Sequence, residues 1–549
     1  MKSSVKKVLS VLILAVVLVA SLAAQSIYEK QPLFGKTVIL HSNDVHGALE
    51  GYAYLPVLRE KFESQGAKVV IVDAGDFTNG NVYVSSSKGL SSVIMMSAAG
   101  YDIATLGNHE FDFGYPQLVS NLEKASFSVV NANLLKDGVF LFEPAVYTTN
   151  FGNNILFIGL ETPETQTKVN PGLIQGIQFM DNSELWNITQ MVIDAAKAQG
   201  IADTVVVLAH LGIANESKGR RSYELYENVK GIDFIIDGHS HTVMSTPANI
   251  VSSVDPYTVE AGQENYPIQS TGTQFANIGC VIVNDFTGEV EDYYLIPTEG
   301  LEKDPSVLAL AKGFIDEVDA KYGAQFAVSE VEMLAKNKEA RFGEINLGDL
   351  ICDAMVWKIV TENADVDASK VVAITNGGGI RADIHVGPVT MADIKSVLPF
   401  GNTLAVVYAT GTELLEVLEA STFSSPGSIG AFPQVAGIKF TIDTTKPYDQ
   451  GAAYPGSTYY GPASIKRVTI DSINGQPFDP EATYTIISNN FLTAGGDTYY
   501  AFKAAFDAGK AFDASIPLDE VVVEYIQKVL GGVIGSEYAE PQGRITMIK

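Results

Sequence analysis

The sequence has few cysteines and few basic residues. Its 549 residues include two cysteines, Cys280 and Cys352, which lie far apart and show no CxxC spacing. A disulfide framework and a CxxC metal or redox site are therefore excluded, and we expect both thiols to be buried. Lysine and arginine total 36 against 64 acidic residues, a formal net charge of −28. Because an acidic surface repels polyanions, we expect no nucleic-acid polymer as a partner.

Long apolar runs are also scarce. One such run, from Val8 to Ala20, follows three lysines and leads into small residues that end at Ala24. This layout is typical of a cleavable secretory signal over residues 1–25. A transmembrane anchor is the alternative, but about 20 apolar residues are needed to cross a bilayer. We therefore expect an exported protein, periplasmic or secreted, with no stable membrane anchor after cleavage.

The remaining composition is that of a folded protein. Hydrophobic residues make up 46% of the chain and charged residues 18%, which allows large cores and does not suit a disordered chain. At about one domain per 150 residues, the length predicts several folded units.

A repeated pattern runs from residue 37 to about residue 297. Short β-branched segments alternate with loops and helix-like stretches, and the β-branched segments cover residues 37–40, 69–72, 103–106, 155–160, 204–208 and 234–236. Apolar strands separated by helices predict an α/β layered domain with a buried sheet, whose ligands bind at the carboxyl ends of the strands. We assign this domain to residues 36–298.

The rest of the chain predicts a connector and a second α/β domain. Apolar residues at helical spacing between Leu301 and Gly323 predict an amphipathic helix, which we place in a linker over residues 299–325. Residues 326–549 then combine helical stretches (347–360, 412–420 and 515–529) with strands at 371–375 and 484–488.

Polar residues that commonly bind metals follow five of the first-half strands. In chain order these segments are Asp44-Val45-His46, Gly75-Asp76, Gly107-Asn108-His109-Glu110, His210 and Gly238-His239-Ser240-His241. They contain five of the seven histidines, whereas His41 and His385 are expected to be ordinary core or surface residues. Two divalent ions about 3.5 to 4 Å apart need a bridging carboxylate with imidazole and oxygen ligands on either side. The loops therefore predict a two-metal site.

Two arginines mark a candidate phosphate site in the second half. Arg341 precedes a predicted helix, and Asn376-Gly377-Gly378-Gly379-Ile380-Arg381 follows the strand at residues 371–375. Glycines let backbone amides approach an anion, and an arginine can hold phosphate at two points. Because the chain has only seven arginines, this placement favours phosphate binding by Arg341, Asn376, Gly378 and Arg381. Surface ion pairs are the alternative.

The order of these motifs resembles that of the calcineurin-like metallophosphoesterases. Together, the two halves resemble the secreted bacterial 5′-nucleotidase and UDP-sugar hydrolase family, from about Thr37 to near the C-terminus. The resemblance implies a four-layer αββα metallophosphoesterase domain, followed by an α/β substrate-binding domain over residues 326–549. It also implies two divalent metals, such as zinc or manganese, with Asp76 between them. The other implied ligands are Asp44, His46 and His241 for one metal and Asn108, His210 and His239 for the other.

The resemblance implies roles for several further residues. His109 would stabilise the transition state and assist the leaving oxygen, with Asp112 orienting it. Their spacing suits one face of a helix, although an acidic residue at a helix N-terminus is the alternative for Asp112. Glu110 and the segment 398–402 are expected to be structural. In the second half, the base would lie between Phe432 and Phe491, and the ribose would contact Asp497.

The expected activity is phosphate release from small 5′-nucleotides by water activated between two metals. UDP-sugar hydrolase and 2′,3′-cyclic-nucleotide phosphodiesterase are alternatives within the same family. A nucleotide-binding or adhesion module that has lost catalysis is an alternative of another class. Because all seven expected metal ligands and the His109/Asp112 pair are present, the sequence favours an enzyme.

Overall fold

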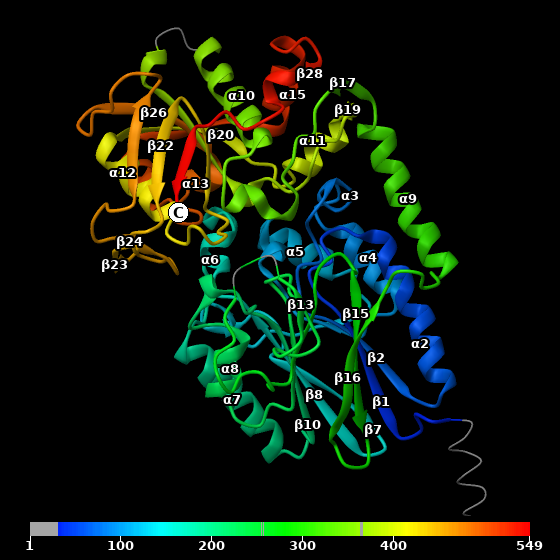
Figure 1. Cartoon of the computed structure of the whole chain (residues 1–549). Helices are drawn as coiled ribbons and strands as arrows, with labels where there is room; N and C mark the ends of the chain where they lie inside the picture. The colour runs from blue at the N-terminus through cyan, green and yellow to red at the C-terminus, as the bar shows by residue number, and fades with distance from the viewer. Residues whose placement is uncertain (1–30, 254, 256, 363–365) are drawn as a thin grey trace, which may run out of the picture.

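The computed structural model describes residues 31–549 apart from 254, 256 and 363–365. The expected secretory signal at residues 1–25 lies outside this part of the chain. Among the described residues, no helix is both long enough and apolar enough to cross a membrane. Figure 1 shows two domains joined along one side by the long helix α9 (Pro305–Tyr322). This helix lies within the predicted linker.

Two β-sheets form the centre of the first domain. Six strands make the first sheet, in the order β16 (Val290–Pro297), β15 (Asn277–Asn284), β1 (Lys36–Ser42), β2 (Lys68–Asp73), β3 (Ile103–Ala104) and β4 (Ser128–Val129). Seven strands make the second, in the order β13 (Ile250–Ser252), β12 (Val243–Met244), β14 (Ile268–Thr271), β11 (Phe234–Asp237), β10 (Thr204–His210), β8 (Asn153–Glu161) and β7 (Ala145–Asn150).

The two sheets pack face to face, and helices cover their outer faces. Ile39 and Val70 of the first sheet and Phe157 and Val206 of the second belong to one buried cluster. The outer face of the first sheet packs against α2 (Tyr54–Ser64), α4 (Leu90–Ala99) and α9. The outer face of the second sheet packs against α7 (Ser183–Ala198) and α8 (Ser222–Asn228). The predicted αββα arrangement is confirmed.

The predicted first-half strands are β1, β2, β3, β8, β10 and β11. In the first sheet β1, β2 and β3 are parallel, and in the second β8, β10 and β11 are parallel. Their side chains are almost entirely buried, which explains the continuous apolar segments in the sequence. Because parallel strands end at the same edge of a sheet, the loops that follow them gather there.

A five-stranded sheet forms the centre of the second domain. Its order is β21 (Pro433–Ala436), β18 (Val371–Asn376), β26 (Thr483–Asn489), β20 (Thr403–Thr410) and β27 (Ala511–Pro517). Helices α10 (Asn346–Glu362) and α15 (Leu518–Lys528) pack on one face, and α12 (Gly411–Ser421) and α14 (Tyr500–Asp507) on the other. Smaller sheets flank this core, one of β19 (Gly387–Thr390), β17 (Gln325–Ser329) and β28 (Val533–Ile534), the other of β25 (Val468–Ile473), β22 (Ile438–Asp443) and β29 (Ile545–Ile548).

Two local expectations can be compared with the structure. The helix predicted from residue 515 begins at Leu518, because β27 pairs with β20 as far as the Thr403–Pro517 position. Cys280 and Cys352 are buried free thiols, as expected.

The two domains touch on both sides of the space between them. On the side of α9, Val82 of α3 (Val82–Ser85), Val318 of α9 and Ala392 of α11 (Met391–Val397) form a small buried cluster. On the other side, the backbone N–H of Asp497 donates to the carbonyl of Thr167 at 2.7 Å. These contacts close two sides of the space between the domains.

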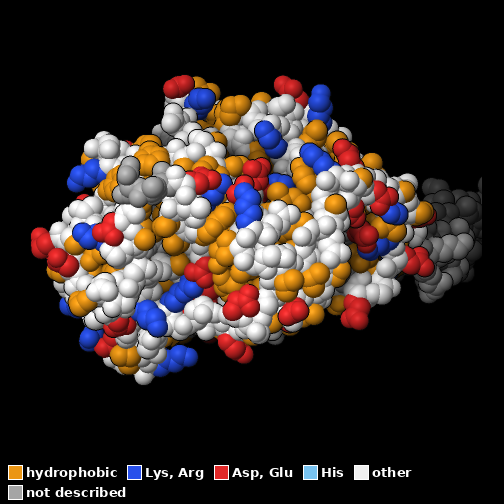
Figure 2. Space-filling model, turned by 90° about the horizontal axis from the view of Figure 1, so that it is seen from above, with side chains coloured by type: hydrophobic (Ala, Val, Ile, Leu, Met, Phe, Trp, Pro, Cys, Tyr) orange, Lys and Arg blue, Asp and Glu red, His pale blue; other side chains and the backbone are white. Residues whose placement is uncertain are grey.

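On the face seen in Figure 2, the acidic side chains are not gathered in one patch. Figure 2 shows the face at the top of Figure 1, where acidic and basic side chains are interspersed among neutral and hydrophobic ones. In the second domain several such charges pair, as Lys358 does with Glu524 at 2.9 Å and Lys395 with Asp519 at 2.5 Å. Lys358 and Asp519 are themselves buried, so neither pair is fully exposed.

Candidate metal centre and active site

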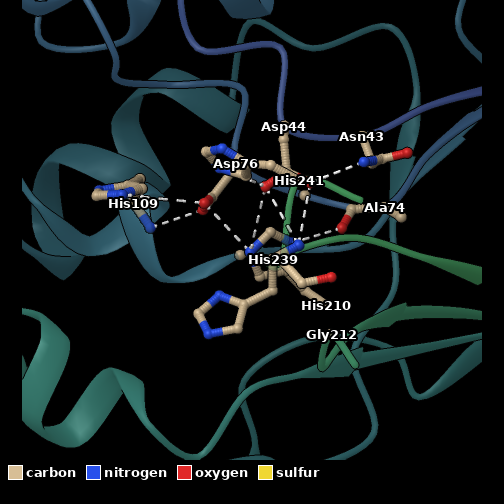
Figure 3. Close-up of polar contacts among 12 residues, drawn as sticks. Asn43, Asp44, Ala74, Asp76, His109, His210, Gly212, His239 and His241 are labelled. Carbon is tan, nitrogen blue, oxygen red and sulfur yellow. Dashed lines mark hydrogen bonds and ion pairs between the residues drawn. The ribbon is translucent and has the colours of Figure 1, made fainter. Parts of the chain in front are cut away.

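Loops from both sheets of the first domain bring their polar side chains to one point (Figure 3). From the first sheet come Asp44 and His46 after β1, Asp76 after β2, and Asn108 and His109 in the short helix η2 (Asn108–Phe111) after β3. From the second sheet come His210 at the end of β10, and His239 and His241 after β11.

Asp76 lies at the centre of this group. Its Oδ2 atom is 3.2 Å from Nε2 of His210, 3.7 Å from Nε2 of His46 and 4.0 Å from Nε2 of His109. Burial works against the charged form of Asp76, but the imidazoles of His210 and His109 hold its pKa well below its usual value. The carboxylate is therefore ionised and faces groups from both sheets.

The ligand atoms fall into three overlapping groups, in each of which all atoms lie within 4.8 Å of one another. Two of these groups agree with the ligand sets that the resemblance implied, and the third adds His109. The groups are Asp44, His46 and His241; Asp76, His210 and His239; and His46, Asp76 and His109.

Several buried acceptors in this cluster have no donor, and this fits a metal cation. Nδ1 of His210 donates to the carbonyl of Ala74 at 2.7 Å, so Nε2 is the ring nitrogen that faces the site. Nε2 of His210 and Oδ1 of Asn108 are buried without a hydrogen-bond partner. Nε2 of His46 and Nε2 of His241 lie only 3.0 Å apart. Such atoms are costly unless a cation binds between them.

The backbone at these positions is strained. Non-glycine residues rarely adopt positive φ angles, and clusters of such residues occur at functional sites. Five of the predicted metal ligands have positive φ: Asp44 (50°), His46 (45°), Asp76 (63°), His239 (74°) and His241 (52°). Close packing adds a further requirement, because a Cβ atom on Gly107 would clash with Oδ1 of Asp76. The loops are shaped to bring the ligands together, at a cost in backbone energy.

Glu110 explains how two of these loops are held. Its buried carboxylate accepts hydrogen bonds from the backbone N–H groups of Asp76, Phe77 and Thr78 at 2.8 to 2.9 Å, and of Gly107 at 2.6 Å. Glu110 thus ties the loop after β2 to the loop after β3. The sequence assigned it a structural role but carried no signal for these partners.

His109 is oriented as a proton donor at the edge of the cluster. Its Nδ1 donates to Oδ2 of Asp112 at 2.7 Å, and that oxygen also accepts from Nδ2 of Asn79 at 2.6 Å. Burial lowers the pKa of His109, but the carboxylates of Asp112 and Asp76 outweigh burial and raise it above the usual value. The structure thus shows the His109–Asp112 contact that the motif spacing suggested.

Phe400 reaches this site, although the sequence analysis treated residues 398–402 as scaffold. Its ring stacks on the imidazole of His109, with centroids 5.6 Å apart and an interplanar angle of 22°. The guanidinium of Arg381 lies 5.8 Å from the centroid of the same ring. A residue of the second domain therefore packs against both groups. The sequence carried no signal for this contact, which exists only because the domains meet.

A cavity of about 320 Å³ lies between the two domains and contains both candidate sites. The first domain contributes metal-cluster residues together with a wall of Lys168, Asn170, Leu173, Ala214 and Glu216. From the second domain the lining includes Arg341, Asn376, Gly378, Arg381, Phe400, Phe491 and Asp497. The structure thus brings together side chains that are hundreds of residues apart in the sequence.

Arg341 and Arg381 form a cationic pair in this cavity. Among the described residues, no ion pair involves either guanidinium, so surface pairing does not explain their position. Burial and the nearby charge of Arg341 lower the pKa of Arg381 to about 10. Two neighbouring cations without a carboxylate partner are arranged to bind an anion.

Family comparisons agree with this arrangement. The family model for calcineurin-like phosphoesterase matches residues 37–243, and the model for the 5′-nucleotidase C-terminal domain matches residues 325–504. The chain belongs to the family that joins these two domains. It is a metallophosphoesterase of the 5′-nucleotidase type, and divalent metals are the cofactors that calcineurin-like phosphoesterases use.

Three relatives show how far the similarity extends. A trifunctional nucleotide phosphoesterase protein of Bacillus subtilis (strain 168) is 30% identical over 509 residues, which cover 85% of this chain but only 32% of that protein. A 5′-nucleotidase of Vibrio cholerae is 27% identical over 539 residues, covering 90% of this chain and 91% of that protein. The crystal structure of a 5′-nucleotidase precursor from Thermus thermophilus superposes with a TM-score of 0.76 at 28% identity, covering 94% and 99% of the two chains.

The nucleoside end of the cavity in this 5′-nucleotidase-type enzyme differs from expectation at one residue. Phe491 and Asp497 line the cavity, and Nδ2 of Asn376 donates to Oδ2 of Asp497 at 3.0 Å. Phe432, however, is fully buried in the core and does not line the cavity. It directly precedes β21, which pairs with β18 and holds this segment against the sheet. In this arrangement Phe432 cannot stack on a base.

We predict that Asp76→Asn lowers the bound divalent metal, because the amide is a poorer ligand and removes a negative charge between the imidazoles. Metal content per chain, measured by inductively coupled plasma mass spectrometry after removal of free metal, should fall by at least one ion. Asp292→Asn on the exposed side of β16 is the matched control and should keep the wild-type content. Full metal content in Asp76→Asn would contradict the central position of Asp76.

Proposed function

We propose that this protein is an exported two-metal phosphohydrolase that releases phosphate from nucleoside 5′-monophosphates, in preference to di- and triphosphates. One observation carries the proposal: a single cavity contains the His/Asp cluster, two arginines without ion-pair partners, and the Phe491/Asp497 end. A nucleotide fits these three features. Its phosphate would lie between the metals and the arginines, and its nucleoside would extend toward Phe491 and Asp497.

Each group of residues has a separate role in the proposed reaction. Divalent metals held by the cluster would lower the pKa of a coordinated water and polarise the phosphoryl group. Arg341 and Arg381 bind the phosphoryl oxygens and hold the phosphorus in line for attack. His109, oriented by Asp112, donates a proton to the leaving oxygen. Phe400 packs against His109 and keeps its imidazole in place.

Other members of the substrate class differ in what is attached to the phosphate. UDP-sugars and 2′,3′-cyclic nucleotides are alternative substrates, and the name of the Bacillus subtilis relative describes a protein with three nucleotide phosphoesterase activities. Only two arginines line the cavity, which favours a single phosphoryl group over a diphosphate. An inactive binding module is disfavoured by the His/Asp groups whose atoms lie within 4.8 Å of one another and by the contact of His109 with Asp112.

Export is part of the proposal. It is supported by the layout of residues 1–25 and by the relative from Thermus thermophilus, which is described as a precursor. The acidic charge and the interspersed charges in Figure 2 favour a small nucleotide over a nucleic-acid polymer as the ligand.

Product formation from 5′-AMP (adenosine and phosphate), UDP-glucose (UMP and glucose 1-phosphate) and 2′,3′-cyclic AMP (3′-AMP), resolved by chromatography, tests the activity directly. We expect 5′-AMP to give the highest kcat/KM, with product formation abolished by a chelator and restored by divalent metal. The same preparation serves all three substrates, so differences between them reflect the enzyme. Absence of release from 5′-AMP by metal-loaded protein would refute the proposal.

His109→Ala tests the proton donor separately from the metals. We expect kcat to fall by roughly 10²- to 10⁴-fold, the usual contribution of a general acid, while the metal content stays at the wild-type value. His385→Ala is the matched control, because His385 is exposed and contacts Glu332 away from the cavity. Since His109 also belongs to one of the three ligand groups, a loss of metal in His109→Ala would make it a ligand instead.

A further inference from the structure

Glu216 places a buried, partly unsatisfied carboxylate at the nucleoside end of the cavity. It lies in the short helix η4 (Asn215–Ser217), a few residues after His210, and its side chain is 8% exposed. Its Oε1 accepts a hydrogen bond from Nζ of Lys168 at 2.8 Å. Its Oε2 is buried without a hydrogen-bond partner, and the residue lines the cavity. One oxygen of Glu216 is thus fixed, and the other is available as an acceptor.

This carboxylate is held in a constant position relative to the metal centre. Nζ of Lys168 lies 3.6 Å from Oε2 of Glu164, and that oxygen lies 3.2 Å from Nε2 of His239. Burial works against the charge of Lys168, but Glu216 and its other neighbours hold its pKa well above the usual value. Lys168 therefore remains a cation, and it connects Glu216 to a metal-ligating loop through two charged contacts.

The chemistry of the cavity determines which part of a nucleotide Glu216 meets. A carboxylate repels phosphate, so Glu216 cannot serve the end of the cavity that contains Arg341 and Arg381. At the other end, Asp497 is close enough that its pKa, raised to about 6 by burial, is raised in part by the charge of Glu216. This end therefore offers acceptors, beside the apolar ring of Phe491, which can contact a base.

We propose that Oε2 of Glu216 accepts a hydrogen bond from the exocyclic amino group of the nucleobase, and so makes the enzyme prefer aminated bases over oxo bases. This inference rests on the proposed nucleotide hydrolysis. An amino group satisfies the buried oxygen, whereas a carbonyl in the same place faces it with lone pairs and leaves the charge unpaired. Sites built to hydrogen-bond a substrate group discriminate strongly against analogues that lack it.

The test compares kcat/KM for AMP and IMP, which differ in having an amino or an oxo group at position 6 of the purine. We expect the wild-type enzyme to prefer AMP by about 10-fold or more, the value of one hydrogen bond to a charged group. In Glu216→Gln the amide oxygen stays toward Lys168 and the NH₂ group faces the cavity. The preference should therefore disappear or reverse, with kcat/KM for IMP rising.

A control variant and a thermal melt separate this effect from loss of structure. Glu260→Gln removes an exposed carboxylate that pairs with Lys218 at 2.9 Å, and it should retain the wild-type AMP/IMP ratio. Glu216→Gln should melt close to the wild-type temperature. Equal reduction of both substrates in Glu216→Gln would show a structural role and overturn the proposal, as would a wild-type enzyme that does not distinguish AMP from IMP.

Two further measurements complete the test. With 2′-deoxy-AMP and 3′-deoxy-AMP, the change in kcat/KM caused by Glu216→Gln should persist. If that change disappears when either ribose hydroxyl is removed, Glu216 binds the ribose and the proposal is wrong.

If the wild-type protein hydrolyses neither AMP nor IMP, the proposed function fails independently. In that case calorimetric titration with adenosine and inosine decides the role of Glu216, and equal affinities for the two nucleosides would overturn it.

Discussion

The molecule depends on one electrostatic constraint, the placement of an ionised carboxylate, Asp76, among imidazoles that come from two different sheets. Like and unlike charges buried at these distances are stable only if the geometry is maintained by the surrounding fold. The parallel strands supply this geometry, because their ends converge at one edge. Left-handed backbone at the ligands and a glycine at position 107 allow the final approach. Glu110 holds two of the loops together through their backbone amides.

The second domain adds cations to the carboxylates and imidazoles of the first domain. Arg381 lies near the carboxylates of the metal cluster, with the charge of Arg341 beside it, whereas Glu216 of the first domain and Asp497 of the second provide acceptors elsewhere in the same cavity. The cavity is thus suited to anion binding at one end and to donors at the other, inside a protein with a net charge of −28. Attraction of an anionic substrate must therefore be local, because charges on the acidic exterior are screened beyond about 8 to 10 Å.

The sequence predicts much of the fold and the metal cluster because both depend on local patterns. Buried parallel strands are apolar throughout, so the segments at residues 37–40 and 69–72 stand out. The candidate metal ligands directly follow such strands, and their grouping follows from strand topology. The helix was predicted to begin at residue 515, but it begins at Leu518. Residues 515–517 belong instead to strand β27, whose partner strand is distant in the sequence.

Contacts between distant loops could not be predicted in the same way. Glu110 looks like any acidic residue beside a ligand motif, and its four amide partners exist only after two loops meet. Phe400 stacks on His109 only because the domains face each other. Phe432 was expected beside a base, but its position before an edge strand buries it in the core. Glu216 carries no motif, and its importance comes from Lys168 and from the shape of the cavity.

The most direct test of the central claim is an anomalous X-ray diffraction experiment on crystals of the metal-loaded protein. The proposed two-metal function predicts two anomalous peaks about 3.5 to 4 Å apart, both next to the carboxylate of Asp76, with His109 outside the ligand shell of either metal. A single peak, or a metal bound through His109, would contradict this arrangement.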